Sequence, residues 1–318
     1  MAEIGPAASP VPPARPAGEP VDFACRDGLI LKGHFWPARG DAVASVVINP
    51  ATGVLGRYYH YYAAFLSEEG FDVLTYDYRG IGLSRPPSLK GCGYRWRDWG
   101  GQDFDAALRF VDALRPRQPL HVVGHSIGGY LPGLSPQASR IDRMLTMGAQ
   151  YAYWRDYAAR HRMRLFLKWH VAMPALTAIY GYFPGKRLGW LEDLPAGVAH
   201  EWSFRRARME LTHPVTERDE VLRRFAAVKA PILAVTMADD EIGTPAAIRR
   251  TLDYYRGADI TQVLLEPSVY GLETIGHFSL FHSRHAAGFW RDTVRWLRDG
   301  INPWPDRVLA EDQPSRLP

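Results

Sequence analysis

One stretch, His121 to Gly129, constrains the fold of this chain more than any other, because an apolar run leads straight into a serine flanked by glycines. Ser126 lies between Gly124 and Gly128 in the pattern G-x-S-x-G. A serine at a sharp strand-to-helix turn adopts strained backbone angles, and the residues two before and two after it come so close that side chains there would clash. The stretch therefore predicts a strand, a tight turn and a helix whose N-terminus lies beside the serine hydroxyl. The alternative to a functional serine at this turn is an ordinary Gly/Ser turn between a strand and a helix.

Short apolar runs alternate with amphipathic runs along much of the chain, as in sheets with helices on both faces. Strands are predicted over residues 21–25, 29–36, 44–49, 71–76, 120–123, 143–148, 231–237 and 260–265. Helices are predicted over residues 58–69, 103–114, 244–255 and 286–297. Continuous apolar strands are typical of parallel sheets buried on both faces, whereas Asp27 and Gly28 indicate a hairpin between the first two strands. The sequence predicts an α/β fold with a mainly parallel sheet and an antiparallel edge.

The alternation stops between residues 151 and 214, where the sequence is helical in character and rich in tryptophan. We interpret this region as a helical cap inserted over the carboxyl edge of the sheet, where such sheets bind ligands. The predicted core comprises residues 21–150 and 215–304. Residues 1–20 are rich in Pro and Ala and are predicted to be a disordered tail, and residues 305–318 a C-terminal tail.

Composition argues against several other classes of protein. Of 318 residues, 47% are hydrophobic and 23% charged, which is ordinary for a globular domain, and a net charge of +4 says little about partners. Cys25 and Cys92 form no disulfide framework, which fits a reducing, cytoplasmic location. The N-terminus lacks the basic start and apolar core of a secretory signal. The most apolar long run, residues 165–183, contains Lys168 and Pro174, so no stable membrane insertion is expected.

Two later stretches carry the side chains that would activate a serine. A serine nucleophile needs a base within hydrogen-bond reach, and the base needs an orienting acid. Asp239 and Asp240 follow the strand at 231–237, and His277 follows the last strand. The chain therefore presents serine, aspartate and histidine in that order, as Ser126, Asp240 and His277.

Other side chains compete for these roles. Asp239 is the rival acid, with bonding of its own turn or capping of the helix as the alternative use. His282 and His285 are the rival bases and are expected to start the last helix. His125 adjoins the nucleophile, but its side chain should point to the other side of the turn, as a packed neighbour.

Four motifs together carry a resemblance to a known superfamily. They are Val123-Gly124-His125-Ser126-Ile127-Gly128-Gly129, Asp77-Tyr78-Arg79-Gly80-Ile81-Gly82-Leu83-Ser84, Ala238-Asp239-Asp240 and Gly276-His277. Over residues 21–298, less the cap, the chain resembles the serine-nucleophile branch of the α/β-hydrolases, and in particular a poorly characterised group of bacterial predicted hydrolases. The resemblance implies a serine nucleophile and no particular substrate. It also favours Asp240 over Asp239 as the acid. Asp77 and Arg79 are expected to be structural, pairing and bonding the backbone of their turn.

The sequence departs from the family pattern at the loop that stabilises the oxyanion. Many relatives have His-Gly there, whereas this chain has Pro50-Ala51. The oxyanion hole is therefore expected to use the backbone N–H groups of Ile127 and Thr52. Backbone donors need no particular side chain, and one such donor is worth about 3 kcal/mol in the transition state.

The predicted activity is hydrolysis of a carboxylic ester or thioester through an acyl-enzyme on Ser126. An acyltransferase, an amidase or a peptidase would use the same triad, and a non-catalytic binding protein could share the fold. Neither a metal nor an organic cofactor is expected, because the histidines and cysteines lack metal-ligand spacing.

The cap bears on the substrate. Residues 151–214 carry ten Lys or Arg and five acidic residues beside many aromatics. These side chains either pack the cap and form a solvated face, or they build an apolar acyl pocket with a cationic rim that favours amphiphilic or anionic substrates. The expected partner is a small-molecule acyl substrate of apolar or amphiphilic character. Nucleic acid is not expected as a partner, because the basic residues are scattered. The sequence does not determine the oligomeric state.

Overall fold

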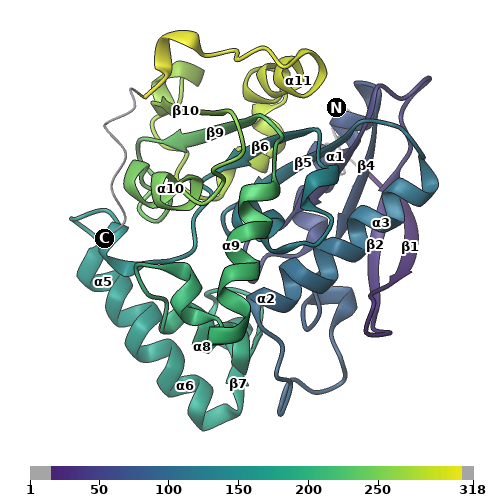
Figure 1. Cartoon of the computed structure of the whole chain (residues 1–318). Coiled ribbons are helices and arrows are strands. Elements are labelled where there is room, and N and C mark those ends of the chain that lie inside the picture. Colours follow the sequence, from purple (N-terminus) through teal and green to yellow (C-terminus); the bar gives the residue numbers. More distant parts are fainter. Residues whose placement is uncertain (1–15, 310–318) are drawn as a thin grey trace, which may run out of the picture.

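The fold is built on one mixed sheet of eight strands with helices on both faces, seen in a computed structural model that describes residues 16–309 (Figure 1). The strands lie in the order β1-β2-β4-β3-β5-β6-β9-β10. The two pairs β1–β2 and β2–β4 are antiparallel, and the other five pairs are parallel. Their bounds are β1 Glu19–Ala24, β2 Ile30–Trp36, β3 Ala44–Asn49, β4 Phe71–Tyr76, β5 Leu120–His125, β6 Arg143–Met147, β9 Ile232–Met237 and β10 Ile260–Leu265. The predicted fold class is confirmed.

Alternate side chains of the central strands enter two separate apolar cores, one on each face of the sheet. In β5, Val122 packs on one face and Val123 on the other, and both are fully buried. One face is covered by α1 (His60–Glu68) and α11 (Phe289–Asp299). The other is covered by α3 (Asp105–Leu114), α9 (Arg218–Ala227) and α10 (Pro245–Leu252). Burial on both faces explains why these strands are continuously apolar.

Several predicted boundaries differ from the structure. Helix α10 ends at Leu252 rather than 255, and α11 begins at Phe289 rather than 286. The prediction that His282 and His285 start the last helix is therefore wrong, since both lie before Gly288 in short turns. Helix α9 was not predicted, because half of its ten residues are charged.

The two predicted tails are only partly described. Most of residues 1–20 lies outside the described residues, although β1 already begins at Glu19. At the other end, the ring of Trp304 stacks on Phe289 at 5.6 Å, and Val308 pairs with Val263 on the edge of the sheet. Residues 310–318 lie outside the described residues.

Between β6 and α9 the chain forms a helical segment at one side of the sheet, shown in teal and green in Figure 1. Its elements are α5 (Arg162–Phe166), α6 (Met173–Tyr180), β7 (Tyr182–Phe183), α7 (Gly185–Leu188), β8 (Leu194–Pro195) and α8 (Ala196–Ser203). The indole of Trp169 stacks on Trp202 at 4.6 Å and meets Trp190 edge-on at 5.7 Å. Tryptophan packing thus holds the segment together. No helix within residues 16–309 has the length and apolar character needed to cross a bilayer.

The turn after β4 is held by two buried charged side chains, as the sequence suggested. Asp77 accepts backbone N–H groups from Gly56 at 2.7 Å and Leu83 at 2.8 Å. Arg79 donates from Nε to Asp103 at 2.5 Å and from Nη1 to Asp27 at 2.7 Å. Asp103 is fully buried, whereas the side chain of Asp27 is 41% exposed. Arg79 therefore depends on Asp103 for compensation of its charge inside the protein.

We expect Asp103→Asn to lower the free energy of unfolding by about 3–5 kcal/mol, because it leaves the buried guanidinium of Arg79 without its main counter-charge. Asp27→Asn, the same change at the exposed partner, should cost about 1 kcal/mol or less. Urea unfolding of the two variants measures the difference. Equal losses would contradict the assignment of Asp103 as the dominant partner.

Candidate active site

Ser126 lies on a strained turn between β5 and α4 (Ile127–Tyr130). Its backbone angles are φ 54° and ψ −124°, a conformation that L-residues rarely adopt. Two hydrogen bonds hold the turn: the Ser126 N–H donates to the carbonyl of Met147 at 2.9 Å, and the Gly129 N–H donates to the carbonyl of Ser126 at 3.0 Å. The hydroxyl consequently stands at the carboxyl edge of the sheet, next to the N-terminus of α4.

The two flanking glycines permit this turn. A Cβ on Gly124 would lie 2.5 Å from the Cα of Gly129, and a Cβ on Gly128 would lie 2.2 Å from the carbonyl oxygen of Asn49. Both distances are far inside van der Waals contact and involve backbone atoms that cannot move aside. The close approach predicted from the sequence is therefore present at both positions.

Asp240 and His277 form a buried pair beyond the ends of β9 and β10. The Nδ1 atom of His277 lies 2.6 Å from Oδ2 of Asp240. The other carboxylate oxygen of Asp240 accepts backbone N–H groups from Ile242 at 2.8 Å and Gly243 at 2.7 Å. Burial acts to raise the pKa of Asp240, but His277 and the two backbone donors bring it below its ordinary value. The carboxylate therefore stays ionised and orients the imidazole.

Asp239 has a different partner, and this distinguishes it from Asp240. Its Oδ2 accepts the backbone N–H groups of Ile275 at 2.8 Å and Gly276 at 3.0 Å. These residues directly precede His277. The structure thus places Asp240 on the imidazole and Asp239 on the loop that carries it, a contact that the sequence analysis had not foreseen.

His125 is buried on the far side of the turn and connects two loops of the site. Its Nε2 lies 2.9 Å from the backbone oxygen of His277, and its Nδ1 lies 2.8 Å from the hydroxyl of Tyr59. That hydroxyl also accepts the backbone N–H of Ala51 at 2.9 Å. Burial, with the nearby His277, lowers the pKa of His125 to about 3, so the ring is neutral at ordinary pH. It packs as the sequence analysis expected and ties the loop after β3 to the loop after β10.

A small cavity of about 100 Å³ brings Ser126 and His277 together. Thr52 lines it as well. The N–H of Ala51 already donates to the hydroxyl of Tyr59, so the backbone N–H of Thr52 is the candidate donor in this loop. Within residues 16–309, the Ser126 hydroxyl accepts a hydrogen bond from Nε2 of Gln150 at 3.1 Å and makes none to His277. Catalytic hydrogen bonds are often long without substrate and tighten when it binds.

Comparison with known families identifies the chain. A family model described as serine aminopeptidase, S33, matches residues 40–268, well over half of the sequence. The chain belongs to this family of α/β-hydrolases. A search of curated proteins by sequence returns no significant match to the hydrolase.

Solved structures share the hydrolase's fold at low sequence identity. A soluble variant of monoglyceride lipase from Saccharomyces cerevisiae, in complex with a substrate analogue, has a TM-score of 0.65 at 16% identity, covering 91% of this chain and 98% of its own. DcsB with its substrate analogue has a TM-score of 0.59 at 14% identity, covering 89% and 99%. An esterase from Pyrococcus furiosus has a TM-score of 0.54 at 16% identity, covering 87% and 90%. Likeness at such identity bears on the fold alone.

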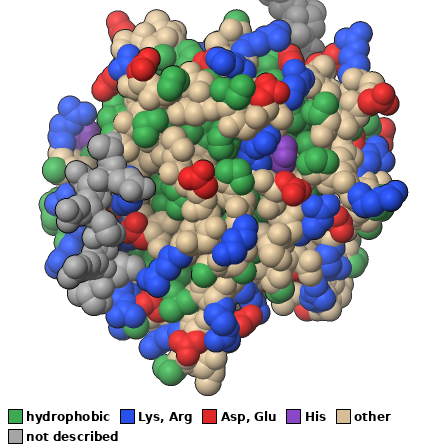
Figure 2. Space-filling model, turned by 45° about the horizontal axis from the view of Figure 1, so that its top comes forward, with side chains coloured by type: hydrophobic (Ala, Val, Ile, Leu, Met, Phe, Trp, Pro, Cys, Tyr) green, Lys and Arg blue, Asp and Glu red, His purple; other side chains and the backbone are tan. Residues whose placement is uncertain are grey.

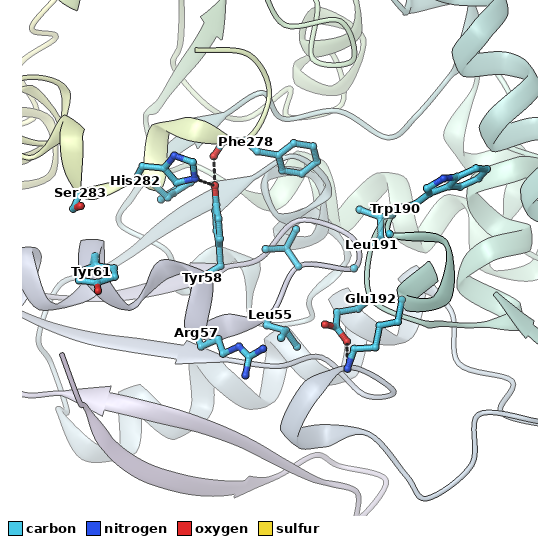
Figure 3. Close-up of a pocket in the computed structure, with 15 residues that line it drawn as sticks. Leu55, Arg57, Tyr58, Tyr61, Trp190, Leu191, Glu192, Phe278, His282 and Ser283 are labelled. Atoms are coloured by element: carbon cyan, nitrogen blue, oxygen red, sulfur yellow. Dashed lines mark hydrogen bonds and ion pairs between the residues drawn. The ribbon is translucent and has the colours of Figure 1, made fainter. Parts of the chain in front are cut away.

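The hydrolase has a second, larger cavity of about 730 Å³ beside the first (Figure 3). Trp190, Leu191 and Phe278 line both cavities and form their common wall. Figure 3 shows Arg57 on one side of the larger cavity and His282 on the opposite side. The hydroxyl of Tyr58 donates to the carbonyl of Phe278 at 2.6 Å and lies 3.0 Å from Nε2 of His282.

The rival histidines lie apart from Ser126. Neither His282 nor His285 lines the cavity that contains Ser126. Gln150 was not predicted from the sequence, although its position offered a signal. It is a polar residue just beyond β6, the neighbour of β5, where the carboxyl ends of adjacent parallel strands meet. Residues 16–309 contain no group of three or more His, Cys, Asp or Glu side chains that could hold a metal ion.

Proposed function

We propose that the hydrolase cleaves a carboxylic ester or thioester through an acyl-enzyme on Ser126. The observation that carries the proposal is a single one: Ser126 and His277 line one small cavity, while Asp240 bonds the far nitrogen of the same imidazole. A hydroxyl, a base and an orienting acid in this relation are the parts that serine nucleophile catalysis requires.

The reaction would proceed in two halves. The Oγ atom of Ser126 attacks the acyl carbon while its proton passes to Nε2 of His277, and the carbonyl electrons move to the oxygen. Collapse of this intermediate breaks the bond to the leaving group, which takes the proton from His277. Water then gives a proton to His277 as its oxygen attacks the acyl-enzyme, and collapse returns that proton to Ser126 and releases the acid. Asp240 stabilises the charged imidazole in both halves.

We assign the oxyanion to the backbone N–H groups of Ile127 and Thr52. Ile127 is the first residue of α4, so its N–H belongs to the unpaired, positive end of that helix. Thr52 is 5% exposed and lines the small cavity opposite the turn. One donor in such a hole contributes about 3 kcal/mol to transition-state stability.

We further propose that residues 151–214 act as a cap that selects the acyl group. Leu165, Trp169 and Trp202 of this segment line the small cavity and make it largely apolar. The ammonium of Lys168 lies 4.4 Å from the ring of Trp169 and 4.5 Å from that of Trp190, so one cation remains at the rim. These contacts support a small apolar or amphiphilic acyl substrate.

Alternatives with the same triad differ in the acceptor or in the bond that is cleaved. An acyltransferase would exclude water from the acyl-enzyme, and an amidase or peptidase would protonate an amine. A non-catalytic binding protein is disfavoured by the buried Asp240–His277 pair. Nucleic acid is disfavoured because acidic and basic side chains intermingle on the face shown in Figure 2. Cys25 and Cys92 are free thiols, which supports the cytoplasmic location that we propose.

The proposal predicts covalent labelling of Ser126. A fluorophosphonate should label the wild-type protein at this residue, and Ser126→Ala should abolish both labelling and ester hydrolysis, because no other hydroxyl can replace the nucleophile. Intact mass and peptide mapping give the stoichiometry and the position. A folded wild-type protein that resists the reagent would favour the binding-protein alternative.

The two neighbouring aspartates give a matched test of the acid. Asp240→Asn should lower kcat by about 10³- to 10⁴-fold, because the amide no longer stabilises the imidazolium or its tautomer. Asp239→Asn is the same chemical change one residue earlier. It keeps an oxygen that can accept from Ile275 and Gly276, so kcat should fall less than tenfold. Steady-state rates with a p-nitrophenyl ester measure both, and the reverse order would reassign the acid to Asp239.

A further inference from the structure

The two cavities differ in size and in position relative to His277, and these differences assign parts of the substrate. Resting on the proposed function, we propose that the hydrolase takes a short acyl group in the small cavity and a large, anionic leaving group in the larger one. The substrate class is therefore a short-chain ester or thioester of a bulky alcohol or thiol that bears a phosphate or carboxylate.

The volumes limit what each cavity can contain. The small cavity has a volume of about 100 Å³, well below the range of about 300–1,000 Å³ typical of sites that hold a whole ligand. It is closed by Leu165, Trp169 and Trp202, which are all buried. The larger cavity, at about 730 Å³, falls within the range of about 300–1,000 Å³ that accommodates whole small-molecule ligands. A long acyl chain does not fit the first, and a large group fits the second.

The position of His277 decides which end of the substrate lies where. In the proposed reaction this imidazole protonates the leaving group, so the leaving group lies on its side of the scissile bond. Phe278, the next residue in the chain, lines both cavities, and Phe281 and His282 lie a few residues further on and form one wall of the larger cavity. We therefore place the leaving group across the common wall of Trp190, Leu191 and Phe278, in the larger cavity.

Charge in the larger cavity favours an anion. Its two basic side chains are Arg57 and Lys186, and its one carboxylate is Glu192. Lys186 is neutralised by Glu192 at 2.9 Å. None of the ion pairs recorded within residues 16–309 includes Arg57, whose guanidinium therefore remains available to a phosphate or carboxylate.

Two substrate series test the division. The first lengthens the acyl chain from acetyl to dodecanoyl on one leaving group, and kcat/KM should fall at least tenfold beyond about four carbons. The second keeps the acetyl group and enlarges the leaving group from ethanol to a phosphorylated pantetheine thiol, and kcat/KM should rise. A rise with acyl length would overturn the proposal, and so would indifference to the leaving group.

Three variants locate the effect. Ser283 is exposed and lines the larger cavity, so Ser283→Trp should lower kcat/KM at least tenfold for the large leaving group and leave the ethyl ester unchanged. Arg57→Gln should remove the preference for the phosphorylated thioester over its dephosphorylated form. Arg206→Gln removes an equal charge from an exposed position that lines neither cavity and should keep that preference.

The outcomes separate this proposal from the one on which it rests. If Ser126 is labelled but Ser283→Trp suppresses long acyl chains instead of large leaving groups, the substrate lies the other way round and the division is overturned. If Arg57→Gln and Arg206→Gln behave alike, the anion site is overturned. If neither labelling nor hydrolysis occurs, the proposed function fails as well.

A different observation concerns Gln150, which contacts the nucleophile directly. Its Nε2 donates to Oγ of Ser126 at 3.1 Å, and its Oε1 accepts the backbone N–H of Ala152. An N–H can only donate, so the amide end facing Ala152 must be the oxygen and the end facing Ser126 must be the NH₂ group. Gln150 is 4% exposed, and Ala152 has a positive φ of 62°. The loop is thus held so that an N–H points at the serine oxygen.

We infer that Gln150 is a catalytic residue that stabilises negative charge on Oγ. As the O–H bond of Ser126 breaks and the proton moves to His277, charge builds on an oxygen that already accepts this N–H. The same donor assists when Oγ leaves in deacylation. The hydroxyl keeps its own proton free for His277, because it accepts from Gln150 rather than donating to it.

Gln150→Glu distinguishes a residue that donates a hydrogen bond to Ser126 from one with only a structural role. A carboxylate cannot donate to Oγ, so at pH 8 the rate of fluorophosphonate labelling should fall ten- to a hundredfold. Burial raises the pKa of a carboxyl group, and the protonated acid can donate again, so the rate relative to wild type should recover as the pH falls. Gln150→Met has no donor at any pH and should show a constant ratio.

Other results would overturn the role of Gln150. A carboxylate acting only by its charge would raise the pKa of His277 and make the relative rate of Gln150→Glu fall towards acid pH, which is the opposite sign. A purely structural side chain would give equal, pH-independent losses in both variants, together with a lower unfolding midpoint.

Discussion

The strained backbone at Ser126 is the constraint on which the rest of the site depends. A positive φ at a serine persists only where the surroundings hold it, and here they do so through backbone contacts on every side. Because Gly124 and Gly128 have no Cβ, their backbone lies against Gly129 and Asn49 at distances that leave no room for a side chain. The adjacent strand β6 accepts the N–H of Ser126 itself. Because these contacts come from the sheet, the position of Ser126 is a property of the whole fold rather than of one loop.

The carboxyl ends of four strands lie near this turn, and residues of the site follow each of them. Ser126 follows β5, Gln150 follows β6, the aspartate pair follows β9 and His277 follows β10. Hydrogen bonds then link the loops to one another, with His125 joining the loop after β3 to the backbone of His277 and Asp239 fastening the residues before it. Parallel strands make this convergence possible because their ends lie along one edge of the sheet.

In the proposed function, the helical segment between β6 and α9 provides the selectivity. Its tryptophans pack against one another and also line the small cavity, so the same side chains stabilise the segment and shape the proposed acyl site. Packing and pocket formation were alternative predictions for these aromatic residues, and the same side chains can do both. Two of its basic residues differ in their contacts. Arg164 is paired with Glu241, whereas Lys168 lies between two indole rings at the rim.

The sequence by itself determined the fold class, the turn at Ser126 and the strand ends where an acid and a base could lie, because apolar periodicity and glycine spacing are local properties. It could not determine helix α9, whose charged composition hides its packing face, or the ends of α10 and α11. Only the tertiary structure decided that Asp240 bonds His277 while Asp239 bonds the loop before it, that Gln150 donates to Ser126, and that two cavities of unequal size share one wall. Those relations join residues tens of positions apart, so they depend on how the loops pack and not on any pattern along the chain.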